Sequence, residues 1–360
     1  MNHQSPNGAQ RPHGDQPNRN QPHLMAAYGG EGWQPRSRAL AGELGTIWGA
    51  CGVNSEWSPL KQVLLHRPGD ELAASADPNA VQMVEVLDIA KAQAQHDAIA
   101  QAYRDNGVTV HYVNPPTTPT PNQMFCADLM FMTPEGCILA RPASDVRAGE
   151  ERQLAAALAR EGVPILRSIS GRGVFEGADA AWITPNLVMV GRGIRTNQAA
   201  IDQMRSVLGE SGVEVIAFDM PIGTMHLQGM VRFADHNLAL AWPVRLAYHA
   251  VEALKAAGYR VEFLPDVDES IHNAAFNFVT LGPRKILMAA GNPTTQQFYE
   301  SLDIECVTVN VDELYKAAGS IGCLSGTVRL PAIARSSWSL DPLTRCWTHF
   351  REPRSAIPDS

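Results

Sequence analysis

The sequence has 360 residues, of which 45% are hydrophobic and 18% are charged, and its formal net charge is -8 at pH 7. This acidic balance argues against a surface that follows nucleic-acid phosphates, and it suits a small cationic ligand. The longest apolar runs are well below the roughly 18 residues of a membrane-spanning helix. The first residues also lack the apolar segment of a secretory signal. We therefore expect a cytoplasmic protein without membrane contact.

The two ends of the chain differ in composition from the rest. Residues 1–38 are polar and rich in proline, which predicts a disordered leader because such a segment buries too little surface to offset its chain entropy. We expect one folded α/β domain over residues 39–335 and a tail over residues 336–360. The tail contains Trp338 and Trp347, so it could cover a neighbouring subunit, which leaves a homo-oligomer open.

A helix-like stretch, a glycine and a short alternating strand recur along the chain. The glycines are Gly107, Gly162, Gly212 and Gly258, about 50 residues apart, and a fifth, less similar copy covers residues 302–306. Glycine suits this position because helices often end on a left-handed residue, which glycine adopts at little cost. Each copy therefore predicts a helix that leads into a strand.

A second kind of strand precedes each of these helices. Its five copies are nearly all apolar, as is typical of strands buried on both faces. They lie at residues 63–68, 137–142, 187–190, 238–243 and 286–289. The chain is therefore predicted to consist of five strand-helix-strand modules.

The candidate reactive side chains fall in the segments between these modules. Four such segments, each just before an apolar strand, contain Asp128, Glu176 with Asp179, His226, and Asn277, and Cys323 follows the fifth module. If the five modules surround an axis, residues at equivalent positions converge on that axis. The spacing thus predicts one site that contains a thiol, an imidazole and carboxylates.

The six cysteines show no Cys-x-x-Cys spacing and no paired histidine motif, which argues against a zinc site or a disulfide framework. Taken alone, Cys323 in its glycine-rich turn is more often a core residue than a nucleophile, and His226 is more often an interior histidine. Cys126 lies beside Asp128 and competes as nucleophile, but we expect it on an alternating strand. Glu176 and Asp179 could be turn formers.

Six motifs in the same order resemble the guanidino-group-modifying superfamily, the penteins, which includes arginine deiminases, amidinotransferases and dimethylarginine dimethylaminohydrolases. The motifs are residues 66–72, the Phe-x-x-Asp that ends at Asp128, residues 175–179, residues 191–197, His226-Leu227 and the glycine-framed Cys323. The resemblance covers roughly residues 48–335. It implies a five-bladed α/β propeller with the active site on the pseudo-five-fold axis and no metal or organic cofactor.

The resemblance also implies roles for individual residues. Cys323 would be the nucleophile, His226 the general acid and base, Glu176 the residue that orients the imidazole, and Asp128 the guanidinium-binding acid. Arg195, with Arg141 or Arg147 as further candidates, would face a substrate carboxylate, although residues 195–197 could equally start a helix. The other expected substrate-binding residues are Asp179, Gln228 and Asn277.

Three positions depart from the pattern of the superfamily. Gln228 replaces an aspartate typical of deiminases and amidinotransferases, Ala127 replaces an arginine, and Gly322 replaces a histidine. These changes leave the substrate open. The expected function is thiol-dependent hydrolysis at the guanidino carbon of an arginine-like or N-substituted compound, through a covalent cysteine intermediate. Amidino transfer to an amine acceptor is the alternative, and the cysteine, histidine and acids argue against a non-catalytic binding protein.

Overall fold

The computed structural model describes residues 24–335, and its contacts divide them after Glu43. The described part of the first unit includes the short 3-10 helices η2 (Ala26–Tyr28) and η3 (Leu40–Glu43). Most of the predicted leader, residues 1–23, and the predicted tail lie outside the described residues, and the domain boundaries stay predictions. No helix within residues 24–335 is long and apolar enough to cross a membrane.

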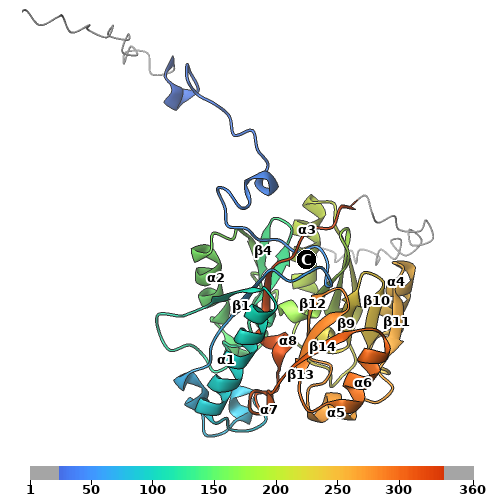
Figure 1. Ribbon diagram of the computed structural model, residues 1–360. Coiled ribbons are helices and arrows are strands. Elements are labelled where there is room, and N and C mark those ends of the chain that lie inside the picture. Colours follow the sequence, from blue (N-terminus) through green and yellow to red (C-terminus); the bar gives the residue numbers. More distant parts are fainter. Residues whose placement is uncertain (1–23, 336–360) are drawn as a thin grey trace, which may run out of the picture. The chain divides into compact units, whose positions relative to one another are not determined.

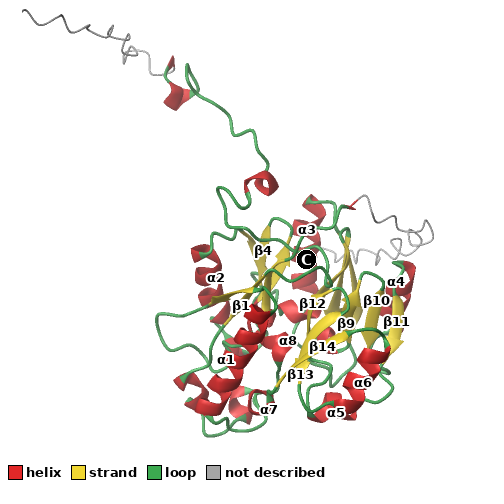
Figure 2. Ribbon diagram, in the orientation of Figure 1, coloured by secondary structure: helices red, strands yellow, loops and turns green. Residues whose placement is uncertain are grey.

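The larger unit contains five sheets of three strands each (Figure 2). In every sheet the middle strand pairs in parallel with the strand that follows it in the chain and antiparallel with the remaining strand. The sheets are β15–β1–β2 (Gly326–Arg329, Gln62–Leu65, Thr109–Tyr112), β3–β4–β5 (Met130–Thr133, Gly136–Leu139, Ile165–Ser168), β6–β7–β8 (Ala180–Thr184, Leu187–Arg192, Glu214–Asp219), β9–β10–β11 (Val231–Asp235, Leu238–Ala241, Arg260–Phe263) and β12–β13–β14 (Val279–Gly282, Lys285–Ala289, Glu305–Val309).

One helix connects the middle strand of each sheet to its parallel neighbour, as the module pattern predicts. These helices are α1 (Ile89–Asp105), α2 (Glu150–Arg160), α3 (Gln198–Glu210), α4 (Tyr248–Ala256) and α6 (Pro293–Ser301). The four repeated glycines after them have φ between 69° and 89°, which confirms the predicted left-handed turns. In the fifth module Asp303 takes this conformation, with φ 59°, so a non-glycine residue makes the same turn.

The five sheets contact one another in a closed cycle (Figure 1). β15 contacts β3, β3 contacts the turn before β6, β6 contacts the turn before β9, and β9 contacts β12. The cycle closes where β14 of the fifth sheet contacts α1 of the first module. Within residues 24–335, β15 is the last strand and β1 is the first, and the two pair and so complete the first sheet. This arrangement confirms the predicted five-bladed α/β propeller.

Equivalent short segments precede the antiparallel strand of all five sheets. Three are 3-10 helices, η6 (Cys126–Leu129), η8 (Gly177–Asp179) and η9 (Leu227–Gly229). The fourth is the loop that follows α5 (Asp268–His272), and the fifth is α8 (Ile321–Leu324), which lies between α7 (Asp312–Tyr315) and β15. The candidate reactive residues therefore occupy one structural position, once in each module.

Candidate active site

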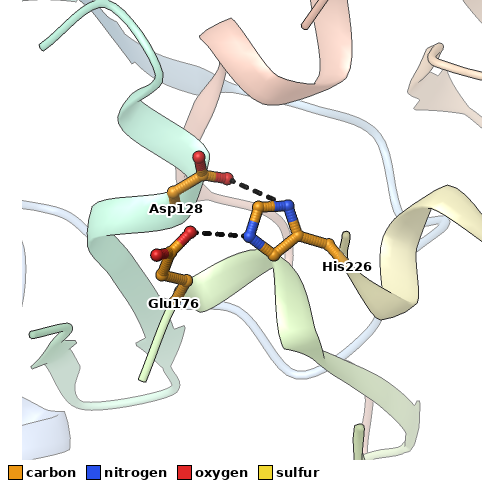
Figure 3. A group of neighbouring side chains, drawn as sticks. All are labelled: Asp128, Glu176 and His226. Atoms are coloured by element: carbon orange, nitrogen blue, oxygen red, sulfur yellow. Dashed lines mark hydrogen bonds and ion pairs between the residues drawn. The ribbon is translucent and has the colours of Figure 1, made fainter. Parts of the chain in front are cut away.

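The imidazole of His226 lies between two carboxylates (Figure 3). Its Nε2 is 2.7 Å from Oε2 of Glu176, and its Nδ1 is 3.8 Å from Oδ1 of Asp128. All three side chains are buried. Burial by itself lowers the pKa of His226, but the charge of Asp128 and the hydrogen bond to Glu176 raise this pKa to about 9. The geometry therefore favours a protonated imidazole near neutral pH.

Small residues allow these segments to approach. A Cβ on Gly177 would lie 2.5 Å from the carbonyl oxygen of Ala127, so only glycine lets η8 pack this closely against η6. Asp179 at the end of η8 then accepts hydrogen bonds from the Leu227 N–H, at 3.1 Å, and from the Thr196 hydroxyl, at 2.6 Å. Asp179 thereby fixes the chain immediately after His226. Its two carboxylate oxygens serve this internal contact, and its predicted substrate contact stays a prediction.

Arg147 is a buried cation behind the two carboxylates. Its guanidinium contacts Asp128 at 2.7 Å, Glu150 at 2.9 Å and Glu176 at 3.3 Å. Arg195 is half-buried and lies 3.1 Å from the other oxygen of Glu176. Both arginines are thus paired with acids of the site. Their predicted role toward a substrate carboxylate stays a prediction.

Asn277 holds the candidate nucleophile through two contacts. Its Nδ2 lies 3.0 Å from Sγ of Cys323, and its Oδ1 accepts the backbone N–H of Cys323 at 3.3 Å. Burial, followed by the negative charge of Asp128, raises the pKa of the Cys323 thiol. The Asn277 hydrogen bond and the charge of Arg232 act in the opposite direction. The thiolate form of Cys323 would therefore need further positive charge nearby.

A cavity of about 310 Å³ brings the histidine and the cysteine together. His226 and Cys323 both line it, together with Asn277, Gln228 and apolar residues of α5 and the loops around it. On the other side of Cys323 a much smaller space of about 20 Å³ is lined by Asp128, Arg147 and Arg195. Cys323 therefore borders both the open cavity and the carboxylate pocket.

The remaining predicted residues lie further from the thiol or face other partners. Gln228 lines the large cavity, where its amide donates to the Ala180 carbonyl at 3.2 Å and accepts from Arg232 at 3.2 Å. Arg141 is exposed and donates to the Gly173 carbonyl at 3.0 Å. Asn197 caps α3 by accepting from the Ala200 N–H, so this stretch does start a helix.

Cys126 is the one competing thiol, and its predicted location was wrong. It begins the 3-10 helix η6 and does not lie on an alternating strand. The side chain is fully buried, and burial raises the pKa of its thiol well above the usual value. An uncharged, inaccessible thiol is a core residue, since the thiolate is the nucleophilic form.

Among the described residues, one cluster has the composition of a metal site. Ligand atoms of Asp128, Glu176 and His226 all lie within 4.8 Å of one another. The carboxylates already contact the guanidinium groups of Arg147 and Arg195, so a metal ion would meet two positive charges there. The donor set fits a proton-transfer site better than a metal centre.

Two cations of the large cavity were missed from the sequence. Arg232 lies on β9, four residues after Gln228, and Arg245 stacks 4.4 Å above the Trp242 ring. Neither belongs to a recognisable motif. The sequence did offer one signal for Arg232, because it is a charged residue among the apolar residues at the start of its strand.

Comparison with known proteins identifies the family. The family model described as eukaryotic N,N dimethylarginine dimethylhydrolase matches residues 74–329, which is more than half of the chain. The chain therefore belongs to this family, within the guanidino-group-modifying superfamily that its motifs resemble. A dimethylarginine dimethylaminohydrolase of Streptomyces coelicolor is 28% identical over 272 residues, which cover 75% of this chain and 98% of the relative. The enzyme of that name from Pseudomonas aeruginosa is 25% identical over 240 residues, or 66% of this chain and 89% of the relative.

Solved structures show the same fold. A variant of the Pseudomonas aeruginosa dimethylarginine dimethylaminohydrolase complexed with citrulline has a TM-score of 0.63 at 21% identity, and the match covers 74% of this chain and 98% of that one. An inosamine-phosphate amidinotransferase from Streptomyces griseus has a TM-score of 0.64 at 13% identity, covering 81% and 100%. These likenesses agree with the five-bladed propeller. The chain is an enzyme of a family that acts on guanidino C–N bonds.

Proposed function

We propose that this protein is a thiol hydrolase that acts on an arginine-like or N-substituted guanidino compound. The observation that carries the proposal is the position of His226, which contacts Glu176 and Asp128 and lines the same cavity as Cys323. A nucleophile, a proton-transferring group and carboxylates for a planar cation therefore surround one space. Membership of the dimethylarginine dimethylhydrolase family supports hydrolysis over transfer.

In the proposed first step, Asp128 pairs with the substrate guanidinium and holds it flat beside the thiolate of Cys323. The sulfur attacks the guanidino carbon and forms a C–S bond. His226 gives its proton to one nitrogen, the C–N bond to that nitrogen breaks, and a neutral amine leaves. The product of this step is a covalent amidino-enzyme that retains its positive charge on the remaining nitrogens.

In the second step His226, now neutral, takes a proton from a water molecule, and the oxygen of this water attacks the same carbon. The C–S bond then breaks, Cys323 returns as a thiolate, the proton of the new hydroxyl passes to solvent, and a neutral urea-type product forms. If an amine attacks in place of water, the same side chains complete an amidino transfer. The two reactions therefore differ only in the acceptor.

The test is a substrate screen. Arginine, methylarginines, agmatine and guanidino acids are incubated with the protein, with and without glycine as acceptor, and ammonia, amine, ornithine and ureido products are measured. We expect a ureido product and an amine or ammonia, independent of glycine. Product that forms only with glycine would identify a transferase, and no turnover of any of these compounds would contradict the proposal.

The nucleophile is tested by replacing it. Cys323→Ser should reduce turnover by about a thousandfold or more, because a neutral serine hydroxyl is a far weaker nucleophile than a thiolate. Cys306→Ser is the matched control, since Cys306 is a half-buried thiol on β14 and does not line the cavity. Equal activity of both variants would exclude Cys323. The cytoplasmic location and the homo-oligomer stay predictions.

A further inference from the structure

Arg232 is a cation without a carboxylate partner in the interior of the propeller. Its Nη1 donates to the amide oxygen of Gln228 at 3.2 Å, and its guanidinium lies 5.9 Å from the centre of the Phe278 ring. No carboxylate of residues 24–335 lies within ion-pair distance of it, and its buried Nε has no hydrogen-bond partner there. Such a charge is costly unless something nearby is negative when the protein works.

The guanidinium lies between two cavities. Arg232 lines the 310 Å³ cavity that contains Cys323, and it also lines a second cavity of about 90 Å³. The acid in the second cavity is Glu56, which accepts the Trp182 N–H at 2.8 Å. Burial raises the pKa of Glu56 to about 7. Glu56 is thus only partly ionised near neutral pH and is a weak counter-charge for Arg232.

The residue before the nucleophile shows how close this charge comes. A Cβ built on Gly322 would collide with Nη2 of Arg232 and would lie 2.6 Å from Oδ1 of Asn277. The guanidinium therefore fills the space that a side chain at position 322 would need. Two positions that depart from the pattern of the superfamily fit this arrangement. Gly322 leaves room for the Arg232 guanidinium, and Gln228 accepts a hydrogen bond from it without neutralising its charge.

We infer that Arg232 is the resident cation that stabilises the thiolate of Cys323, acting from the module of His226 across the ring. The inference rests on the proposed function of Cys323 as nucleophile. Arg232 makes no covalent contact with the substrate and supports the thiolate by its field. A buried guanidinium beside a thiol lowers the energy of the thiolate, as positive charges do at other reactive cysteines.

The other groups that face Cys323 do not replace this charge. Asp128 is negative and opposes ionisation of the thiol. Tyr315 also interacts electrostatically with Cys323. His226 is a cation on the same cavity, but it must give up its proton during the reaction. Asn277 contributes a neutral hydrogen bond at 3.0 Å.

Arg147 and Arg195 line the small space beside Cys323, but both are paired with acids of the site. Arg245 lines the large cavity and is exposed. Arg232 is therefore the interior cation on the cavity of Cys323 that has no carboxylate partner within residues 24–335.

The experiment measures the ionisation of Cys323 without any substrate. The rate of alkylation by iodoacetamide is followed from pH 5 to pH 10, with the Cys323 peptide quantified by mass spectrometry. Removing the charge in Arg232→Gln should raise the apparent thiol pKa by about one unit, which slows alkylation at pH 7 about tenfold. Arg232→Lys, which keeps a positive charge, should restore part of the rate.

A second variant tests the same idea by neutralising the charge in place. Gln228→Glu puts a carboxylate on the atom that already accepts from Arg232, and it should also raise the thiol pKa. Arg205→Gln removes a cation on α3, outside the cavity, and should leave the profile unchanged. Thermal melting checks the fold of each variant.

The pH profile of Cys323 alkylation in folded Arg232→Gln decides whether Arg232 stabilises the thiolate. If Arg232→Gln does not fold, the profile of Gln228→Glu decides it. A profile that superimposes on that of the unaltered protein would overturn the inference. The result does not depend on turnover, so a failed substrate screen with a shifted alkylation profile would contradict the proposed reaction and leave the role of Arg232 standing.

Discussion

Oε2 of Glu176 lies 2.7 Å from Nε2 of His226, and the same carboxylate also contacts the guanidinium groups of Arg147 and Arg195. One fully buried acid thus balances three cationic groups from three parts of the chain. Burial alone would raise the pKa of Glu176, but the hydrogen bond and charge of His226, with the two arginines, lower it. Glu176 therefore stays ionised over the pH range in which His226 exchanges its proton.

Replacing this acid should change the proton affinity of the histidine. In Glu176→Gln we expect the pKa of His226 to fall from about 9, because one of the groups that raise it is neutralised. The upper pH limit of turnover should fall with it, and kcat should decrease about a hundredfold. NMR titration of the histidine ring measures the pKa directly. Asp219→Asn removes an exposed acid paired with Arg192 and is the control, and an unchanged His226 titration in Glu176→Gln would contradict the assignment.

Asp128 should determine how tightly the guanidinium binds. Its Oδ1 is buried without a hydrogen-bond partner among the described residues, whereas Oδ2 is held by Arg147 at 2.7 Å. Asp128→Asn removes the charge-assisted bond to substrate and should lower kcat/KM about a hundred- to a thousandfold. Steady-state kinetics on the best substrate of the screen checks this. Asp145→Asn, at an exposed position of the 3-10 helix η7 (Asp145–Arg147), should leave kcat/KM within about twofold.

The stability of the protein should fall as the pH rises. Burial raises the pKa of Asp179 to about 7, so between its ordinary value and pH 7 the folded chain holds a proton that the unfolded chain releases. The same sign holds for His226 between its ordinary value and about 9. We therefore expect the free energy of unfolding to decrease from pH 5 to pH 9, as measured by urea denaturation.

Asp179→Asn isolates the first part of this dependence. An asparagine can keep the contacts to the Leu227 N–H and the Thr196 hydroxyl, but it does not titrate. The variant should therefore show a flatter curve between pH 4 and pH 7, and a smaller decrease above pH 7, because the charge of Asp179 also helps to raise the pKa of His226. A slope below pH 7 equal to that of the unaltered protein would show that Asp179 is not the titrating group.

The space beside Arg232 leads to a prediction about glycine. Gly322→Ala should displace the guanidinium or the Asn277 amide and lower kcat at least tenfold, because the added Cβ would collide with both. Gly209→Ala in α3 is the matched control, since its Cβ would meet no atom within 4 Å. This control should raise stability by up to about 1 kcal/mol through helix propensity, with activity unchanged. Activity assays and thermal melts distinguish the two effects, and full activity of Gly322→Ala would refute the crowding.

The turn of the fifth module allows two opposite substitutions to be compared with each other. Asp303 has a left-handed φ of 59°, where glycine occurs in the other modules. Asp303→Gly should stabilise the protein by about 0.5 to 1 kcal/mol, and Gly258→Ala, whose Cβ would find open space, should destabilise it by about 1 kcal/mol through φ alone. Denaturation midpoints measure both. Loss of stability in Asp303→Gly would mean that the aspartate side chain contributes more than its backbone costs.

The fold was largely predictable because its signals are local. Turn glycines such as Gly107 and apolar strands such as residues 187–190 report on the backbone of their own module. The repeat then placed Asp128, Glu176 and His226 at one position per module, and the structure brings these three together. Their roles in catalysis stay predictions until they are tested by experiment.

The ion pairs between side chains of the site could not be predicted from the sequence. Arg147 was one of the candidates to face a substrate carboxylate, and that role stays a prediction. Its contacts with three acids from separate segments could not be predicted, because they depend on distances that only the folded ring defines. The prediction of a strand at Cys126 was wrong because the short 3-10 helix η6 has apolar residues like those of a buried strand. Arg232 was missed because a lone arginine near a strand end normally points to solvent.

The pairing of β15 with β1 sets the order in which the enzyme becomes competent during synthesis. Cys323 lies in the last segment before β15, so a nascent chain that already contains His226 and Glu176 still lacks both its thiol and the strand that seals the first blade. Reactivity should arise only when the final stretch has left the ribosome and docked onto residues made some 260 positions earlier. An incomplete chain would thus carry the acids and the histidine without any reactive sulfur beside them.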